Sequence, residues 1–167
     1  MSFLEIIKES ISETYICSGK FLEEKEAGMR ITINGENFIF CKFGIDVNKD
    51  FLNHFSNESG LKKMADYIIF YKLFILHIEL KKGKANNDAS KQLKACEEFT
   101  NYIIGTLERI GKKIQKSNCK FYKIRISEAD IRKFKTKTKP SDCIHKIEEN
   151  YFSYKSDVLD LIRFNKI

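Results

Sequence analysis

The sequence predicts a single α/β domain of the mixed α+β kind, in which helices flank a central mixed sheet. The long segment Asp88–Ile110 repeats apolar residues at helical spacing. Two apolar runs before it, Tyr67–Phe70 and Leu73–Lys81, indicate strands, and Phe121–Ile126 after it alternates apolar and polar residues as a strand does. The chain has 167 residues, which suits one domain spanning 1–167.

The N-terminal part predicts a helix and then a hairpin. Ser2 followed by Glu5 has the spacing of a capping box, which opens a helix. The apolar residues expected on its buried side are Leu4, Ile7, Ile11 and Tyr15. Met29–Ile33 and Asn37–Phe43 then flank Asn34-Gly35, a dipeptide typical of tight turns between paired strands.

The remaining segments give weaker patterns. A short helix is expected around Phe51–Phe55 within an otherwise polar stretch, and Gly111 is placed to end the long helix. The chain from Ile144 onward is expected to be helical, especially over Val158–Phe164.

Positive charge is concentrated in the middle of the chain. Residues 61–140 hold 20 basic and 8 acidic residues, a net charge of +12, whereas 1–60 carry −4 and 141–167 carry −1. Such a basic surface attracts polyanions, of which nucleic acid is the commonest. A solvated lysine-rich surface without a ligand is the alternative.

The sequence predicts a cytoplasmic protein without a membrane partner. No apolar run approaches the roughly 20 residues of a membrane helix, and residues 1–20 lack the pattern of a signal peptide. The five cysteines form no CxxC pair, so we expect reduced and mostly buried thiols rather than disulfides or a zinc site.

The strand Leu73–Lys81 has one apolar face and one face that becomes polar at its end. Glu79 and Lys81 lie on the polar face, and side chains two apart on a strand are neighbours at roughly 6.6 Å. The opposite face is entirely apolar: Phe74, Leu76, Ile78 and Leu80. A carboxylate on so hydrophobic a strand needs a partner or a metal ion, because burying it alone is costly.

Asp66 is the second candidate acid. If the chain turns at Lys72-Leu73, Asp66 lies opposite Glu79, with Cβ atoms roughly 4.5–5.5 Å apart. Two carboxylates this close repel unless a cation lies between them, and their oxygens suit Mg²⁺ or Mn²⁺. A slip of one residue would put Asp66 on the other face.

Ala65-Asp66 and Glu79-Leu80-Lys81 resemble the two active-site strands of the PD-(D/E)XK nuclease superfamily, with Ala65 in place of the family's proline. The helix with Lys91-Gln92-Leu93 resembles the family's following helix, which often carries a glutamine. The resemblance covers about residues 61–126. It implies a restriction-endonuclease-like fold and a metal-dependent nuclease, with DNA favoured over RNA, acting in defence or DNA repair.

The resemblance also implies roles. Asp66 and Glu79, with the backbone carbonyl of Leu80, would bind Mg²⁺, for which Mn²⁺ can substitute. Lys81 would help deprotonate the attacking water and stabilise charge on the phosphate, and Gln92 would orient that water or contact the substrate. The lysines that could hold substrate phosphates are Lys82, Lys84, Lys91, Lys94, Lys133, Lys135 and Lys137.

Several alternatives remain open at this stage. Glu79 and Lys81 could form a surface ion pair, Gln92 could be a helix-surface residue, and Arg132–Lys139 could be a solvated loop or strand. His77 is expected to be a neutral imidazole, packed or exposed, rather than a ligand. The whole chain could be a non-catalytic nucleic-acid-binding or protein-interaction module on the same fold. Whether it forms a homodimer or binds a partner protein is also open.

Overall fold

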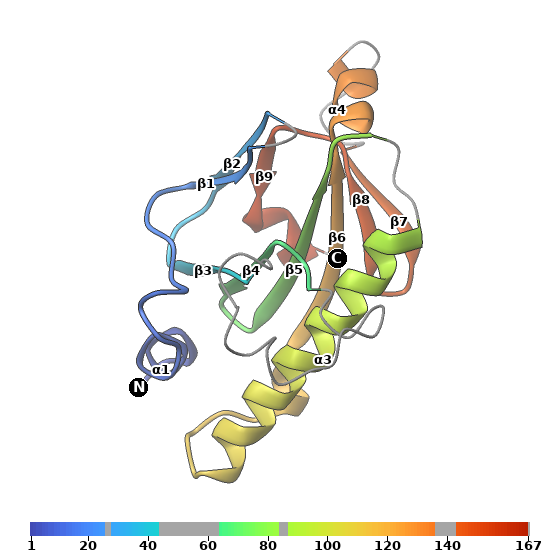
Figure 1. Cartoon of the computed structure of the whole chain (residues 1–167). Helices are drawn as coiled ribbons and strands as arrows, with labels where there is room; N and C mark the ends of the chain where they lie inside the picture. The colour runs from blue at the N-terminus through green and yellow to red at the C-terminus, as the bar shows by residue number, and fades with distance from the viewer. Residues whose placement is uncertain (26–27, 44–63, 84–86, 136–142, 167) are drawn as a thin grey trace, which may run out of the picture.

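Two sheets organise the chain in the computed structural model, which describes residues 1–25, 28–43, 64–83, 87–135 and 143–166 (Figure 1). In chain order the elements are α1 (Phe3–Ser10), β1 (Phe21–Glu24), β2 (Met29–Asn34), β3 (Phe38–Lys42), β4 (Tyr67–Tyr71), β5 (Phe74–Lys81), α3 (Asn87–Arg109), the 3-10 helix η1 (Lys116–Asn118), β6 (Lys120–Ser127), α4 (Glu128–Lys135), β7 (Ile144–Glu148), β8 (Tyr151–Tyr154), β9 (Val158–Asp160) and the 3-10 helix η3 (Leu161–Lys166). The predicted mixed α+β class is confirmed.

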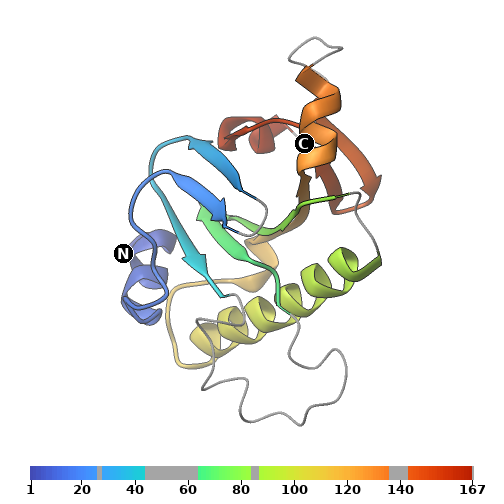
Figure 2. The same cartoon turned by 45° about the horizontal axis from the view of Figure 1, so that its top comes forward.

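The larger sheet has six strands in the order β3-β4-β5-β6-β8-β7, and it is mixed. β4 pairs antiparallel with both β3 and β5, whereas β6 pairs parallel with both β5 and β8, and the edge strand β7 pairs antiparallel with β8. α3 lies across one face of this sheet with α1 beside it (Figures 1 and 2). The other face packs against the three-stranded sheet β1-β2-β9 and against η3. The two faces of β4 and β5 are therefore both buried, which explains their continuous apolar sequence.

The predicted capping box opens α1. The Ser2 hydroxyl accepts a hydrogen bond from the Glu5 backbone amide at 3.3 Å, and the Glu5 carboxylate accepts one from the Ser2 amide at 2.5 Å. Ile7 and Ile11 are buried as expected, but the helix ends at Ser10. Tyr15 therefore lies beyond the helix, where its backbone carbonyl instead accepts a hydrogen bond from the amide of Lys42 on β3.

The long helix α3 is confirmed, with Ala89, Leu93 and Cys96 fully buried on the face toward the sheet. Gly111 follows it with φ at 83°, a left-handed conformation that glycine adopts without strain, and its amide donates to the Glu108 carbonyl. Within the described residues, no helix is both long and apolar enough to cross a membrane.

The predicted hairpin around Asn34-Gly35 is wrong. β2 and β3 are both strands, but β2 pairs with β1 and β9 while β3 pairs with β4. The chain uses Gly35 to pass from the small sheet to the large one, and Gly35 lies directly against the side chain of Leu161. A bend at residues 36–37 follows β2, but the two strands do not pair with each other, because contacts far along the chain supply partners for both.

The predicted C-terminal helix is also wrong. Residues 144–160 form β7, β8 and β9, and only Leu161–Lys166 is helical, as a 3-10 helix. All four residues of β8 are buried, so the strand is covered on both faces of the sheet. Aromatic residues suit such a strand, which lies inside the sheet between β6 and the edge strand β7. The helix expected around Phe51–Phe55 lies outside the described residues.

Gly35→Ala should lower the free energy of unfolding by about 1–3 kcal/mol through overpacking. A Cβ atom at Gly35 would lie 3.0 Å from Cδ1 and 3.1 Å from Cβ of the buried Leu161. Gly105→Ala is the matched control, because nothing lies within 4 Å of a Cβ atom there, and alanine inside a helix should add about 0.5–1 kcal/mol. Urea unfolding of both variants measures the change in the free energy of unfolding. Equal changes in the two variants would contradict the close contact between Gly35 and Leu161.

Candidate active site

The β4–β5 hairpin brings two acidic residues to one end of the six-stranded sheet. Tyr67 pairs with Ile78, and the chain reverses at Lys72, whose φ of 52° is left-handed. This is the register predicted from the sequence, so that prediction is confirmed. Continued by one residue beyond β4, the register places Asp66 opposite Glu79, on the face covered by α3.

Glu79 is a buried carboxyl group with one satisfied oxygen. It is only 1% exposed, and its Oε1 lies 2.5 Å from the Lys81 ammonium. Its Oε2 is buried and has no hydrogen-bond partner among the described residues. Burial, followed by the nearby charge of Asp66, raises the pKa of Glu79 to about 8, although the Lys81 ammonium opposes this shift. Because Glu79 is buried, the pair it forms with Lys81 is not a surface ion pair.

Asp66 is half-buried and is fixed by the neighbouring strand. Its Oδ2 accepts a hydrogen bond from the backbone amide of Leu80 at 2.8 Å. Burial raises the pKa of Asp66 to about 6, and the charge of Glu24 adds to this, whereas the Leu80 amide and the Lys81 ammonium lower it. The Leu80 side chain itself is buried in the core on the opposite face. Asp66 and Glu79 therefore differ in environment, and Asp66 ionises first.

Lys81 and Gln92 join the two acids into one cluster. The Lys81 ammonium donates to Gln92 Oε1 at 2.9 Å, in addition to its contact with Glu79. The Gln92 amide nitrogen donates in turn to the backbone carbonyl of Met64 at 3.3 Å, two residues before Asp66. Gln92 thus links α3 to the end of β5 and to the segment just before β4, and it is more than a helix-surface residue.

The other predicted phosphate-binding lysines are spread over several segments, and some of them lie outside the described residues. Lys82, Lys91 and Lys94 are exposed, the first just after β5 and the other two on α3. Lys133 and Lys135 fall in α4, so the start of the basic segment is helical and is neither loop nor strand. The side chains of Lys133 and Lys135, and the whole of Lys84 and Lys137, lie outside the described residues.

Sequence reasoning missed Arg125. In the parallel pairing of β5 with β6, Arg125 is the partner of Glu79, and across β8 its partner is Ser153. Side chains at paired positions share a face, so Arg125 extends the polar row that begins with Asp66 and Glu79. The alternation of apolar and polar residues along β6 predicts the face on which Arg125 lies. It does not predict that Arg125 pairs with Glu79, because β5 and β6 are separated in the sequence by the whole of α3.

His77 is a core residue, as the packed alternative expected. It is fully buried, its ring stacks on Phe121 at 6.2 Å between centroids, and Nε2 lies 2.5 Å from the Thr100 hydroxyl on α3. Burial lowers the pKa of His77 to about 3, so the imidazole is neutral near pH 7. It fixes α3 against β5 and takes no part in the acidic cluster.

Two acids of the first helix make their contacts outside the cluster. Glu5 caps α1, and Glu9 lies 3.7 Å from the ammonium of Lys112, which follows α3. Among the described residues no group of three or more His, Cys, Asp and Glu side chains could hold a metal ion. The acidic cluster therefore offers two carboxylates.

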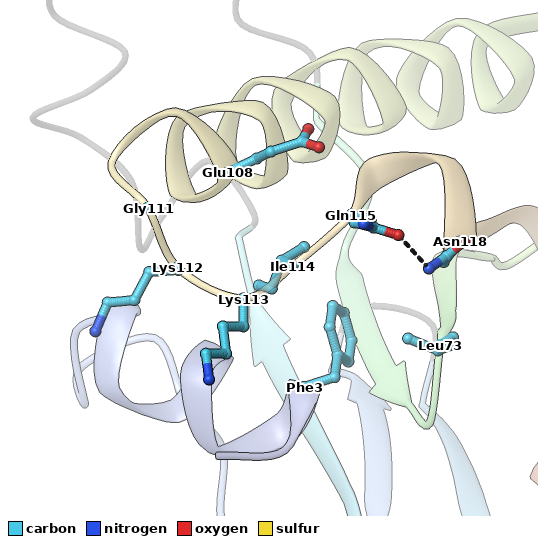
Figure 3. Close-up of a pocket in the computed structure, with 9 residues that line it drawn as sticks. All are labelled: Phe3, Leu73, Glu108, Gly111, Lys112, Lys113, Ile114, Gln115 and Asn118. Atoms are coloured by element: carbon cyan, nitrogen blue, oxygen red, sulfur yellow. Dashed lines mark hydrogen bonds between the residues drawn. The ribbon is translucent and has the colours of Figure 1, made fainter.

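A cavity of about 560 Å³ lies at the other end of the sheet (Figure 3). Leu73 lines it, just before β5 begins, whereas Glu79 lies near the end of this strand. Gln115 and Asn118 in its wall bond to each other at 2.9 Å. Neither carboxylate of the acidic cluster lines this cavity, so it is separate from the candidate site.

The donor set of the cluster fits a hard divalent cation. Asp66 and Glu79 supply carboxylate oxygens, and Glu79 Oε2 is buried and accepts no hydrogen bond from the part of the chain that the structure describes. Mg²⁺ is commonly held by one or two carboxylates and keeps several waters, so two are sufficient.

No protein-family model, curated protein or solved structure matches this chain. What the chain does is therefore inferred from the chemistry of its own side chains.

In the presence of EDTA, the free energy of unfolding should fall as the pH rises from about 6.5 to about 8. This window starts at the ordinary pKa of histidine, so that the titration of histidines contributes little to the change. The folded state keeps a proton on Glu79 up to about pH 8, whereas the unfolded carboxyl loses it near 4.5. The folded state then binds more protons than the unfolded state, so stability declines with pH, by about 1–2 kcal/mol over this window.

Glu79→Gln should flatten this decline, because the amide does not titrate. Added Mn²⁺ should raise the melting temperature of the parent at pH 8 and leave that of the variant nearly unchanged. Thermal unfolding across the pH window measures both effects. Parallel pH profiles for the two proteins, or equal stabilisation by Mn²⁺, would contradict the assignment of Glu79.

Proposed function

We propose that this protein is a metal-dependent nuclease that hydrolyses phosphodiester bonds, with DNA favoured over RNA, and that it serves defence against foreign DNA or DNA repair. The observation that carries the proposal is the buried carboxyl group of Glu79, placed opposite Asp66 and in contact with Lys81. A protein that only bound a polyanion would gain nothing from two carboxylates at this position.

The fold around the site supports a restriction-endonuclease-like arrangement over about residues 61–126. An antiparallel hairpin carries the acids, a long helix follows with Gln92 facing them, and β6 returns parallel to β5. The candidate site lies at the end of two strands of a mixed sheet, on the face covered by α3, whereas the other face packs against the small sheet.

Asp66 and Glu79 would hold Mg²⁺ or Mn²⁺, together with the backbone carbonyl of Leu80. When bound, the ion would act as a Lewis acid on a phosphoryl oxygen and would lower the pKa of a water molecule. The hydrogen bond from the Leu80 amide orients Asp66 for this role.

Lys81 is the residue that would meet the reacting phosphate. Its ammonium is held by Glu79 and Gln92 yet its side chain is 26% exposed, so it can reach a bound substrate. In hydrolysis a water oxygen bonds to phosphorus, one ester P–O bond breaks, and the departing oxygen takes up a proton. Lys81 would stabilise the negative charge that develops on the phosphoryl oxygens, and Gln92 would orient the water.

We place this activity in the cytoplasm. Its support is that all five cysteines are free thiols, three of them buried, as expected in a reducing compartment.

Lys81→Met should reduce kcat for DNA cleavage by roughly 10²–10³ while leaving DNA affinity within a few-fold, because its proposed contact strengthens only in the transition state. Methionine keeps most of the length of the lysine side chain. Cleavage of linear and circular DNA and of RNA would be measured with Mg²⁺, Mn²⁺ or EDTA, alongside the melting temperature.

Lys116→Met is the control for lost charge, because Lys116 is exposed on η1 beyond the other end of β6. Unchanged turnover in Lys81→Met would end the catalytic assignment. A parent protein that binds nucleic acid but cleaves none would instead favour a non-catalytic nucleic-acid-binding module, and one that binds none a protein-interaction module.

The paired substitution Lys91→Ala and Lys94→Ala should weaken DNA binding and reduce its salt dependence. Both lysines are exposed on α3, close in sequence to Gln92. Each lost phosphate contact reduces the slope of log affinity against log salt by about 0.9, so the slope should fall by up to about 2. Lys113→Ala with Lys116→Ala, exposed beyond the far end of α3, is the control. Equal slopes in the two double variants would exclude this surface as the substrate path.

A further inference from the structure

Arg125 lies next to the acidic cluster on the same face of the sheet. It is the pairing partner of Glu79 in the parallel ladder between β5 and β6. It stands three positions before the start of α4, which continues directly from β6 and projects beyond this end of the sheet (Figure 1). Its side chain is 21% exposed, so part of it is reachable from solvent.

The Arg125 guanidinium has one ion-pair partner, but not all of its N–H groups have an acceptor among the described residues. Its Nη2 lies 3.6 Å from Asp130 Oδ2, which is an ion pair at longer than hydrogen-bond distance. Asp130 is itself fixed, because its amide bonds to the Ser127 hydroxyl at 3.1 Å and its Oδ2 accepts from Ser153 at 3.4 Å. The Arg125 Nε–H is buried and has no acceptor among the described residues.

A buried charged donor without an acceptor is unfavourable, and natural proteins rarely keep one without a role. A guanidinium offers five N–H donors in a planar fork that matches the oxygens of a phosphate. Adjacent strands are roughly 4.8 Å apart, so a phosphate at Arg125 would be a close neighbour of a phosphodiester at Asp66 and Glu79.

We propose that Arg125 is a substrate-positioning residue that binds a backbone phosphate of the nucleic acid beside the phosphodiester held at Asp66 and Glu79. This inference rests on the proposed nuclease function. Asp130 keeps the guanidinium oriented through Nη2, and its remaining donors would bind the phosphate oxygens. Arg125 thereby fixes which phosphodiester bond lies over the acidic cluster.

Three variants of the full chain test this. Arg125→Met removes the charge and the fork, Arg125→Lys keeps the charge and removes the fork, and Arg132→Met is the control. Arg132 lies on the nearby α4 but is 76% exposed and pairs with Glu128. Binding of a short duplex DNA is measured in EDTA over a range of salt concentrations, and cleavage is measured with Mn²⁺.

Arg125→Met should weaken DNA binding about tenfold and lower the salt slope by about 1, and it should raise KM with little change in kcat. Arg125→Lys should keep the salt slope and still bind several-fold more weakly than the parent, since it lacks the planar fork. Arg132→Met should stay within about twofold of the parent. A purely structural role would lower the melting temperature without changing the salt slope.

Equal binding by Arg125→Met and Arg132→Met would overturn the inference. If Arg125→Met does not fold, parent-like affinity in Arg125→Lys would overturn it. A parent that binds DNA in EDTA yet never cleaves it would refute the nuclease while leaving the Arg125 contact to be decided by the binding series. A parent that binds no nucleic acid would overturn both.

Discussion

The buried carboxyl group of Glu79 is the feature on which the arrangement of this end of the molecule depends. A carboxylate excluded from water is costly unless a cation or a set of donors compensates for it. Here the compensation from the protein is partial, because Lys81 contacts one oxygen and the other has no partner among the described residues. Three groups surround this incompletely compensated carboxyl group. Asp66 lies across the hairpin, Gln92 on α3 bonds to Lys81, and Arg125 lies on the next strand.

The pairing register of β4 with β5 decides whether this cluster exists. The reversal at Lys72 aligns Tyr67 with Ile78 and so Asp66 with Glu79. A shift of one residue would place Asp66 on the face of the small sheet, among apolar side chains. Both faces of the hairpin are buried, which penalises such a shift, and the backbone amide of Leu80 adds a hydrogen bond that only this register allows.

Local patterns predicted the parts of the fold that local chemistry determines. The buried residues of α3 and the apolar runs of β4 and β5 are properties of short segments. The helix, the two strands and the register of their hairpin are all as predicted. The hairpin at Asn34-Gly35 and the helix over Val158–Phe164 were not, because the partners of β2, β8 and β9 lie far away in the sequence. The role of Arg125 could not be predicted for the same reason, because only the parallel pairing of β5 with β6 makes it a neighbour of Glu79.

The electrostatics of the cluster explain how a polyanion could approach two acids. Burial raises the pKa of Glu79 to about 8 and that of Asp66 to about 6, so without a cation the pair carries about one negative charge near pH 7. Lys81 and Arg125 lie beside them and are cationic, which keeps this end of the sheet from repelling phosphate. A divalent ion would displace the proton of Glu79, since carboxylate ligands bind metal in their ionised form. If the proposed metal binds here, its binding would be coupled to proton release, and the affinity for Mg²⁺ should rise with pH until Glu79 is fully ionised.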